Sequence, residues 1–80
     1  MSNSRNEIFL KAFGLRLKEL RLGKQLSQNK LSILTDIPLS QVGRIERGEV
    51  NPTLNTILLL SISLEVEPKD LLDFTYKKRA

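Results

Sequence analysis

The chain has 80 residues, a formal net charge of +4, and neither cysteine nor histidine. A chain this short forms one small domain with a limited core, so a catalytic domain beside a regulatory one does not fit. Without thiols or imidazoles it lacks disulfides, the usual zinc ligands and histidine bases, so we expect no enzyme, no metal and no cofactor. No apolar run is long enough to span a membrane and no signal peptide is recognisable, so we predict a cytoplasmic protein with no membrane partner and no small-molecule ligand.

Charge is unevenly distributed along the chain. Residues 1–48 hold nine Lys or Arg against four Asp or Glu, whereas residues 49–76 hold one against five. The last four residues, KKRA, add three further positive charges. A cationic N-terminal part favours a polyanionic partner. Nucleic acid is preferred over a membrane because no long basic amphipathic helix occupies the terminus.

The first predicted helix begins at Ser4 and ends at Gly23. Ser4 and Glu7 have the spacing of a capping box, which satisfies two free amide donors at a helix start. Gly23 is the residue type that commonly follows a last helical turn. Apolar residues recur between them at steps of three and four, which predicts one buried stripe: Phe9, Phe13, Leu17 and Leu20.

The second predicted helix is short, covering about residues 28–34. Ser27 is a suitable N-cap, and Leu26 before it lies at staple distance from Leu31. A tight corner follows, because Asp36 tolerates a left-handed conformation and Pro38 keeps its predecessor out of helical angles.

The third predicted helix runs from Pro38 or Leu39 to Arg47, with Gly48 in the left-handed position beyond it. Residues placed at 100° intervals separate into two faces. Val42 and Ile45 point one way, toward a core. The opposite face carries Leu39, Ser40, Gly43, Arg44 and Arg47.

Two more helices complete an all-α prediction. Residues 54–64 contain seven apolar residues and no charge, so this fourth helix is expected to be covered on more than one side. A short fifth helix starts at Pro68 and is expected to continue to about Phe74. No strand pattern or repeat competes with this assignment.

Five segments in register closely resemble the Xre and Cro/C1 family of bacterial and phage transcriptional regulators. They are FGLRLKELR, LSQNKLS, RIERG, NPTLNTILLL and EVEPKDLL, and they cover about residues 13–72. The rest of a single domain spanning residues 1–80 is then a short N-terminal extension of the first helix and a basic C-terminal tail.

The resemblance implies a compact five-helix, lambda-repressor-like domain whose second and third helices form the helix-turn-helix. It also implies a sequence-specific transcriptional regulator that binds double-stranded DNA, with the third helix in the major groove. An α-helix fits that groove, where each base pair presents a distinct pattern of donors and acceptors.

Three outer side chains of the third helix are predicted to reach base edges. The guanidinium of Arg44 matches the two acceptors of guanine, Ser40 can bond a base edge or a phosphate, and Leu39 can touch a thymine methyl. Leu39 departs from the family, which usually has a polar residue there. Gln41, at the boundary of the two faces, either contacts DNA or packs. The bare Gly43 either allows close approach of the helix backbone to DNA or is a tolerated surface glycine.

Other residues are predicted to position the domain on the DNA backbone without reading sequence. Gln28 and Asn29 begin the second helix, where free amides and the helix dipole attract a phosphate. The resemblance assigns that contact to Gln28. Arg47, Asn51 and Thr53 flank the loop after the third helix and are predicted to add phosphate contacts.

The resemblance gives Arg21 and Glu46 a structural role. In this family the corresponding residues commonly pair and tie the first helix to the third. Removing one partner would leave a partly buried charge without its counterion.

The chain has more apolar surface than one small core needs. The resemblance implies a two-fold homodimer on an inverted-repeat operator, with recognition helices about 34 Å apart. The predicted interface lies on the fourth and fifth helices and consists of Leu59, Ile62, Leu72 and Phe74.

A second apolar row on the first helix offers an alternative. Ile8, Leu15 and Leu22 fall seven apart, nearly opposite the buried stripe. They either form the dimer interface instead or contact another protein. The alternative function is therefore a protein-interaction module, such as an antitoxin, whose helix-turn-helix domain mainly holds a protein partner.

Overall fold

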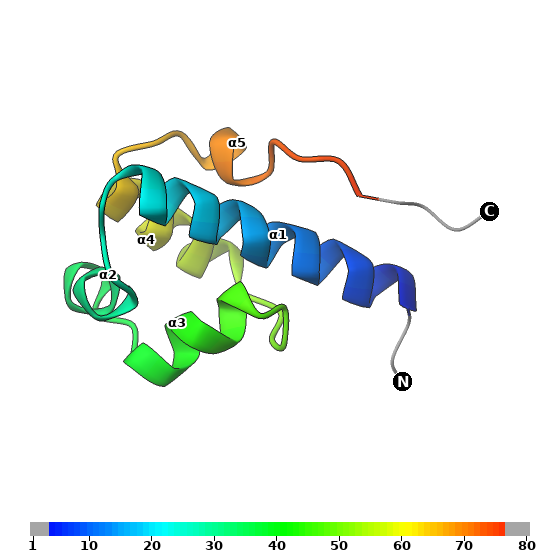
Figure 1. Ribbon diagram of the computed structural model, residues 1–80, viewed down its shortest axis with the longest axis horizontal. Coiled ribbons are helices and arrows are strands. Elements are labelled where there is room, and N and C mark those ends of the chain that lie inside the picture. The colour runs from blue at the N-terminus through cyan, green and yellow to red at the C-terminus, as the bar shows by residue number, and fades with distance from the viewer. Residues whose placement is uncertain (1–3, 77–80) are drawn as a thin grey trace.

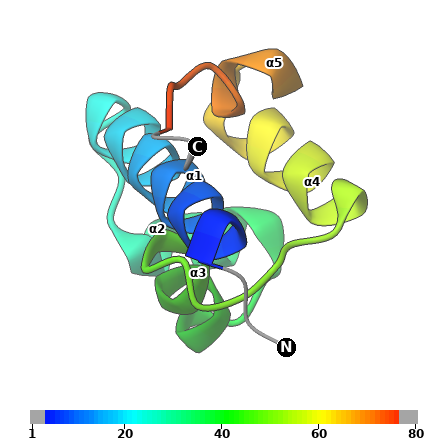
Figure 2. The same cartoon turned by 90° about the vertical axis from the view of Figure 1, so that its right-hand side faces the viewer.

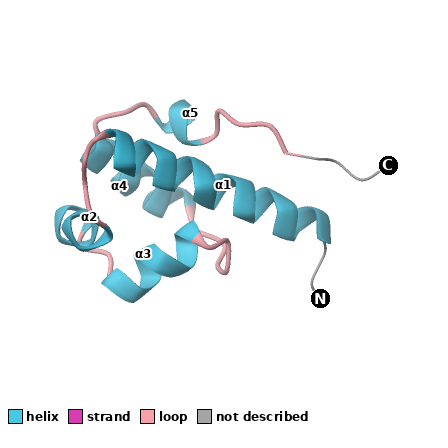
Figure 3. Ribbon diagram, in the orientation of Figure 1, coloured by secondary structure: helices cyan, strands magenta, loops and turns pink. Residues whose placement is uncertain are grey.

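The computed structural model describes the backbone of residues 4–76 and the side chains of residues 6–76. The described chain is helical, without a strand (Figure 3). Its helices are α1 (Ser4–Gly23), α2 (Gln28–Thr35), α3 (Leu39–Glu46), α4 (Leu54–Leu64) and α5 (Pro68–Leu71). The all-α, five-helix prediction is confirmed, and the predicted span of the fourth helix matches α4 at both ends.

The five helices close into a ring around the core. The long helix α1 packs on α3 and on α5, α2 packs on α3 and α4, and α4 packs on α5. In Figure 1, α2 and α3 lie below α1, whereas α5 lies above it and α4 behind it. Figure 2 looks along α1 and shows the α2–α3 pair and the α4–α5 pair on different sides of it. The α2–α3 unit therefore occupies one edge of the molecule, where an external ligand can reach it.

The core forms mostly from the apolar faces that the helical periodicity predicts, but the predicted buried stripe on α1 is wrong at Phe9, which is 37% exposed, and Leu20 is only half-buried. Phe13 and Leu17 of α1 are buried, as are Val42 and Ile45 of α3. Burying each such side chain stabilises the fold by about 1.5–3 kcal/mol. The other buried apolar residues come from α2, the corner, α4 and α5: Leu31, Ile37, Leu60, Leu64 and Leu71.

Local signals set most helix ends as expected. Ser27 caps α2 by accepting a hydrogen bond from the backbone amide of Lys30 at 2.9 Å. Asp36 adopts the predicted left-handed conformation with φ 62°, and Gly48 after α3 has φ 74°. These three residues place the two short helices in the predicted register.

The end of the fifth helix was predicted wrongly. α5 ends at Leu71 instead of continuing to about Phe74. The amide of Leu72 bonds back to the carbonyl of Lys69 at 3.1 Å, a tight turn in place of a further α-helical one. The chain then leaves the helix so that the Phe74 ring packs on Phe9, with the ring centroids 5.3 Å apart. A tertiary contact therefore prevails over the local helical pattern.

Two predictions fall outside the described residues. One is the side-chain half of the capping box at Ser4, although the backbone of α1 does begin there. The other is the basic tail, residues 77–80.

Candidate nucleic-acid interface

The corner between α2 and α3 is held by two hydroxyl groups that sequence analysis did not single out. The Thr35 hydroxyl donates to the carbonyl of Leu31 at 2.8 Å and accepts from the amide of Ile37 at 3.2 Å. The Ser32 hydroxyl donates to the carbonyl of Ile37 at 2.6 Å. Both backbone groups of Ile37 are thus satisfied beside its buried side chain. The corner fixes the direction of α3 relative to α2.

Helix α3 presents one apolar face to the core and one polar face outward. Val42 and Ile45 are fully buried, whereas Ser40 and Arg44 are exposed. Leu39 at the start of the helix is also exposed, and Gln41 is half-buried at the boundary, as the wheel predicts. The outer face therefore carries a guanidinium, a hydroxyl and an apolar group, which together suit donors, acceptors and methyl groups in a DNA major groove.

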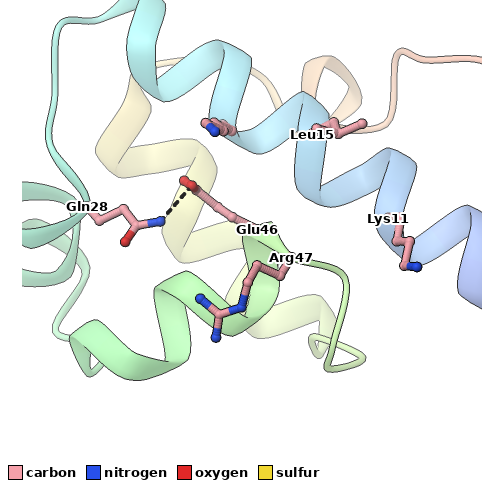
Figure 4. A pocket seen from close by; sticks show the side chains of 6 residues that line it. Lys11, Leu15, Gln28, Glu46 and Arg47 are labelled. Carbon is pink, nitrogen blue, oxygen red and sulfur yellow. Dashed lines mark hydrogen bonds between the residues drawn. The ribbon is translucent and has the colours of Figure 1, made fainter.

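Gly43 lies elsewhere than the wheel placed it. It is buried and not part of the open face. A Cβ at Gly43 would lie 2.9 Å from Nη1 of Arg47 and 3.7 Å from Oε1 of Gln28. The guanidinium of Arg47 occupies the space that a side chain at position 43 would take, and Figure 4 shows it directed back along α3. The missing side chain leaves room for this arginine within the protein.

A buried ion pair between Arg21 and Glu46 joins α1 to α3, as the family resemblance implies. Nε of Arg21 donates to Oε2 of Glu46 at 2.6 Å, and Nη2 donates to Oε1 at 3.0 Å. The third guanidinium nitrogen, Nη1, donates to the carbonyl of Leu26 at 2.8 Å. Gln28 extends the network, since its amide donates to Oε1 of Glu46 at 2.9 Å (Figure 4). This network connects the start of α2 with α1 and α3.

Helix α1 crosses α3 at Gly14, a residue that sequence analysis passed over. A Cβ on Gly14 would lie 2.3 Å from the backbone oxygen of Glu46 and 2.6 Å from that of Ile45. Only glycine allows the backbones to approach this closely. The close crossing places Arg21, two turns further along α1, within reach of Glu46. The signal available in the sequence was a glycine inside an otherwise apolar helical stripe.

The chain after α3 turns in a Schellman motif. The amide of Gly48 bonds to the carbonyl of Ile45 at 3.0 Å, and the amide of Glu49 bonds to the carbonyl of Arg44 at 2.9 Å. This turn carries Glu49 back toward Arg47. Nε of Arg47 donates to Oε2 of Glu49 at 2.8 Å, and its Nη2 to Oε1 at 3.4 Å.

The Arg47–Glu49 pair is exposed and shifts both pKa values. The hydrogen bond from Arg47 is the main cause that lowers the pKa of Glu49; desolvation opposes it, and the positive charges of Arg47 and then Arg44 add to the lowering. The hydrogen bond to Glu49 in turn raises the pKa of Arg47. The carboxylate thus lies in the field of both arginines on the outer side of α3.

The other predicted backbone contacts surround this helix. Asn29 and Asn51 are exposed. Thr53 is exposed as well, and its hydroxyl caps α4 by accepting from the amide of Thr56 at 3.1 Å. Gln28 is half-buried because its side-chain amide is held by Glu46. The structure leaves the Oε1 side of Gln28 beside Gly43, at the junction of α2 and α3.

A groove of about 350 Å³ separates α1 from this junction, and Figure 4 shows its lining. Lys11 and Lys18 line it and are seven residues apart on one face of α1, and neither was predicted from the sequence to contact DNA. The charge of Glu46 is matched by Arg21, so the surface of the groove is cationic. The remaining lining residues are Leu15, Gln28, Glu46 and Arg47.

This arrangement of helices matches a known family. A family model described as helix-turn-helix matches residues 17–71. The chain belongs to the Xre and Cro/C1-type helix-turn-helix family. Members of this family are DNA-binding regulators of transcription, and the resemblance stated from the sequence is confirmed.

Helix-turn-helix proteins similar to this chain include controllers of restriction-modification systems. The control protein C.BamHI of Bacillus amyloliquefaciens is 44% identical over 64 residues, which are 79% of each chain. The controller C.AhdI of Aeromonas hydrophila is 47% identical, with a TM-score of 0.76, over 78% of this chain and 94% of that one. The controller C.Esp1396I, solved as a tetramer with its natural 35 base-pair operator, is 25% identical, with a TM-score of 0.70, over 81% and 96%.

The helix-turn-helix unit lies away from an exposed apolar row on α4. Leu54 is 83% exposed and Ile62 is 62% exposed, and Leu58 stands one turn from each of them. Leu72 beyond α5 is exposed as well. Ile62 and Leu72 were predicted from the sequence as interface residues, whereas Leu54 and Leu58 were not, although the spacing of four between residues 54, 58 and 62 places them on one face.

The other two predicted interface residues are partly covered within the chain. Leu59 is half-buried on α4. Phe74 is half-buried because its ring packs on Phe9, whose ring also meets Tyr76 at 5.1 Å between centroids. Both therefore present a smaller surface to a partner than Ile62 does.

The described residues hold neither a membrane-spanning element nor a metal cluster. Among residues 4–76, no helix combines the length and the apolar character needed to cross a bilayer. Within the same range, no three His, Cys, Asp or Glu residues gather as metal ligands. Asp70 accepts a hydrogen bond from the amide of Glu67 at 2.9 Å at the start of α5.

Proposed function

We propose that this protein binds an inverted-repeat operator in double-stranded DNA as a homodimer and regulates transcription from it. Helix α3 would lie in the major groove, with the N-terminus of α2 on the adjacent sugar-phosphate backbone. The observation that carries this proposal is the exposed outer face of α3, with Ser40 and Arg44 directed away from a core that holds Val42 and Ile45.

Base readout is assigned to the outer face of α3. Arg44 is free to present its planar fork to the N7 and O6 acceptors of a guanine. Ser40 lies one turn earlier and bonds a base edge or a phosphate. Leu39 contacts a thymine methyl, which its exposure at the start of α3 permits. Gln41 contributes at the edge of the same face.

Backbone contacts surround this readout. Gln28 and Asn29 meet a phosphate at the N-terminus of α2, where free amides point outward. Arg47, Asn51 and Thr53 contact phosphates on the other side of α3. Held on a rigid corner, these groups position the recognition helix without contributing sequence information.

The homodimer is proposed to form through α4 and the segment after α5. Ile62 and Leu72 supply exposed apolar surface there, and Leu54 and Leu58 extend it. Leu59 and Phe74 contribute at the margin. A two-fold interface of this kind would place the two copies of α3 about 34 Å apart, one turn of DNA.

The similarity to C.BamHI and C.AhdI supports a role as a restriction-modification controller that acts on its own promoter region. The operator-bound tetramer of C.Esp1396I supports binding of more than one dimer along neighbouring sites.

The test is binding to the DNA upstream of its own gene, measured at several salt concentrations. We expect a steep loss of affinity with salt together with resistance to competitor DNA, because phosphate contacts and base readout act together. Arg44→Ala should remove about 1–3 kcal/mol of discrimination between the correct and the wrong base at one position of the operator. A uniform loss across all sequences would reassign Arg44 to a phosphate, and no preference for any duplex would refute operator recognition.

A second candidate function rests on the outer face of α1. Leu15 is 65% exposed and Leu22 is 55% exposed, and neither lies on the α4 surface. These residues fit a protein-interaction module, such as an antitoxin, that holds a partner along α1. Copurification of a stoichiometric partner that is lost in a Leu15→Lys variant would favour this function.

A further inference from the structure

We propose that Glu49 acts as an internal competitor for the DNA backbone: it holds the guanidinium of Arg47 in the free protein and limits binding to non-specific DNA. This inference rests on the proposed function, because it concerns the surface that meets DNA. It assigns Glu49 a tuning role at the edge of that surface, outside the set of groups that contact DNA directly.

The backbone places Glu49 next to Arg47, so their contact does not depend only on the conformations of two flexible side chains. The left-handed Gly48, with φ 74°, reverses the chain at the end of α3. The amide of Glu49 is then fixed on the carbonyl of Arg44 at 2.9 Å. A carboxylate anchored in this way is paired with Arg47, whose hydrogen bond is the main cause of its lowered pKa, and it also lies in the field of Arg44.

The guanidinium of Arg47 is held by Glu49 and lies over the bare backbone of Gly43. Glu49 accepts from its Nε at 2.8 Å and from its Nη2 at 3.4 Å. Nη1 lies over Gly43, only 2.9 Å from where a Cβ would stand, so the missing side chain makes room for it. The result is an arginine lying back along the recognition helix, with its donors directed at a carboxylate.

A carboxylate and a phosphate compete for the same donors. Each presents oxygens in the fork geometry that a guanidinium matches, and each forms charge-assisted hydrogen bonds with it. DNA must therefore displace Glu49 before a phosphate can take the Nε–Nη2 edge of Arg47. While Arg47 stays paired with Glu49, the pair is close to neutral and releases few counterions from DNA. An arginine that binds a phosphate instead steepens the dependence of log affinity on log salt concentration, the salt slope, by about 0.9.

The size of the effect follows from the exposure of the pair. Both side chains are half exposed, at 58% and 50%. Exposed ion pairs of this kind shift an equilibrium by about 1.5-fold to 5-fold. A factor of this size, repeated in each subunit of a dimer, would change occupancy of non-specific DNA without preventing operator binding.

The experiment uses the full chain and a fluorescein-labelled duplex of random sequence, about 30 base pairs long, with affinity measured across KCl concentrations. For each bound subunit, Glu49→Gln should tighten binding to this duplex about 2-fold to 5-fold over the wild type and steepen the salt slope by about 0.9. Its melting temperature should stay within a few degrees of the wild type, since the pair is exposed. Glu65→Gln is the matched control, because it removes the same charge in the turn between α4 and α5.

A double-mutant cycle separates competition for Arg47 from simple repulsion of DNA. In an Arg47→Ala background, Glu49→Gln should increase the affinity for the random duplex by less than about 1.5-fold. The proposal would be overturned if Glu49→Gln increased the affinity equally in both backgrounds, or did not increase it when Arg47 is present. It would also be overturned if Glu65→Gln increased the affinity as much as Glu49→Gln does. A wild-type protein that fails to bind any duplex would instead refute the proposed function itself.

Discussion

The buried ion pair between Arg21 and Glu46 allows a quantitative test of how α3 is held. Glu46→Ala would remove the acceptor of two guanidinium hydrogen bonds, at 2.6 and 3.0 Å, and of the bond from Gln28 at 2.9 Å. The side chains of Arg21 and Glu46 are only 7% and 3% exposed. Water therefore cannot replace the lost partner without opening the contact between α1 and α3.

The expected destabilisation is large for a domain of this size. Breaking a buried pair by removing one partner costs about 3–5 kcal/mol, because the other charge stays buried. A domain of this length has a total free energy of unfolding of roughly 4–12 kcal/mol. At about 4–8 °C per kcal/mol, Glu46→Ala should lower the melting temperature by more than about 12 °C.

The assay is thermal unfolding followed by circular dichroism, with two comparison variants. Glu19→Ala removes an acid that pairs with Arg16 on the exposed face of α1, and it should change stability by about 0–1 kcal/mol. The double variant Arg21→Met with Glu46→Leu should recover most of the loss, because no charge remains buried. Equal melting of the wild type and Glu46→Ala would show that the pair does not hold α3, and the reasoning would fail.

Three further predictions concern other sites. Gly14→Ala should lower the free energy of unfolding by about 1–3 kcal/mol in chemical denaturation, because the new Cβ would lie 2.3 Å from a backbone oxygen of α3. Gly23→Ala is the control: its Cβ would have no atom within 4 Å, so stability should be nearly unchanged. Gly43→Ala should stabilise by up to about 1 kcal/mol in the same assay, since only the flexible end of Arg47 must move; a clear loss would mean that the guanidinium is rigidly held. Ile62→Lys should shift the protein toward monomer in sedimentation equilibrium, and an unchanged dimer would place the interface elsewhere.

Much of the fold was predictable because its signals are local. A cap such as Ser27 acts on amides within three residues. The left-handed conformations of Asp36 and Gly48 depend on residue type, since aspartate tolerates this conformation and glycine has no Cβ to oppose it. The uncharged run at residues 54–64 identified α4 at both ends. The pairing of Arg21 with Glu46, by contrast, came from family resemblance, since no local rule connects residues 25 positions apart.

The tertiary structure decided where distant groups meet. Helix α5 stops early because Phe74 packs on Phe9 at the far end of α1. A helical wheel placed Gly43 on the open face, but the wheel ignores how a long side chain such as Arg47 can fold back along its own helix. The crossing at Gly14 likewise became visible only when α1 and α3 were packed together.

The sequence by itself therefore determined helix positions, the sign of the charge near α3, and the residue types on its outer face. These depend on short-range hydrogen bonding and on periodicity, both of which can be read from the order of the residues alone. Only the tertiary structure decided which of those groups are free and which are already engaged, as Arg44 is exposed while Arg47 is paired with Glu49. The physical reason is that burial and pairing depend on distances in space, and packing sets those distances once the helices close around a common core.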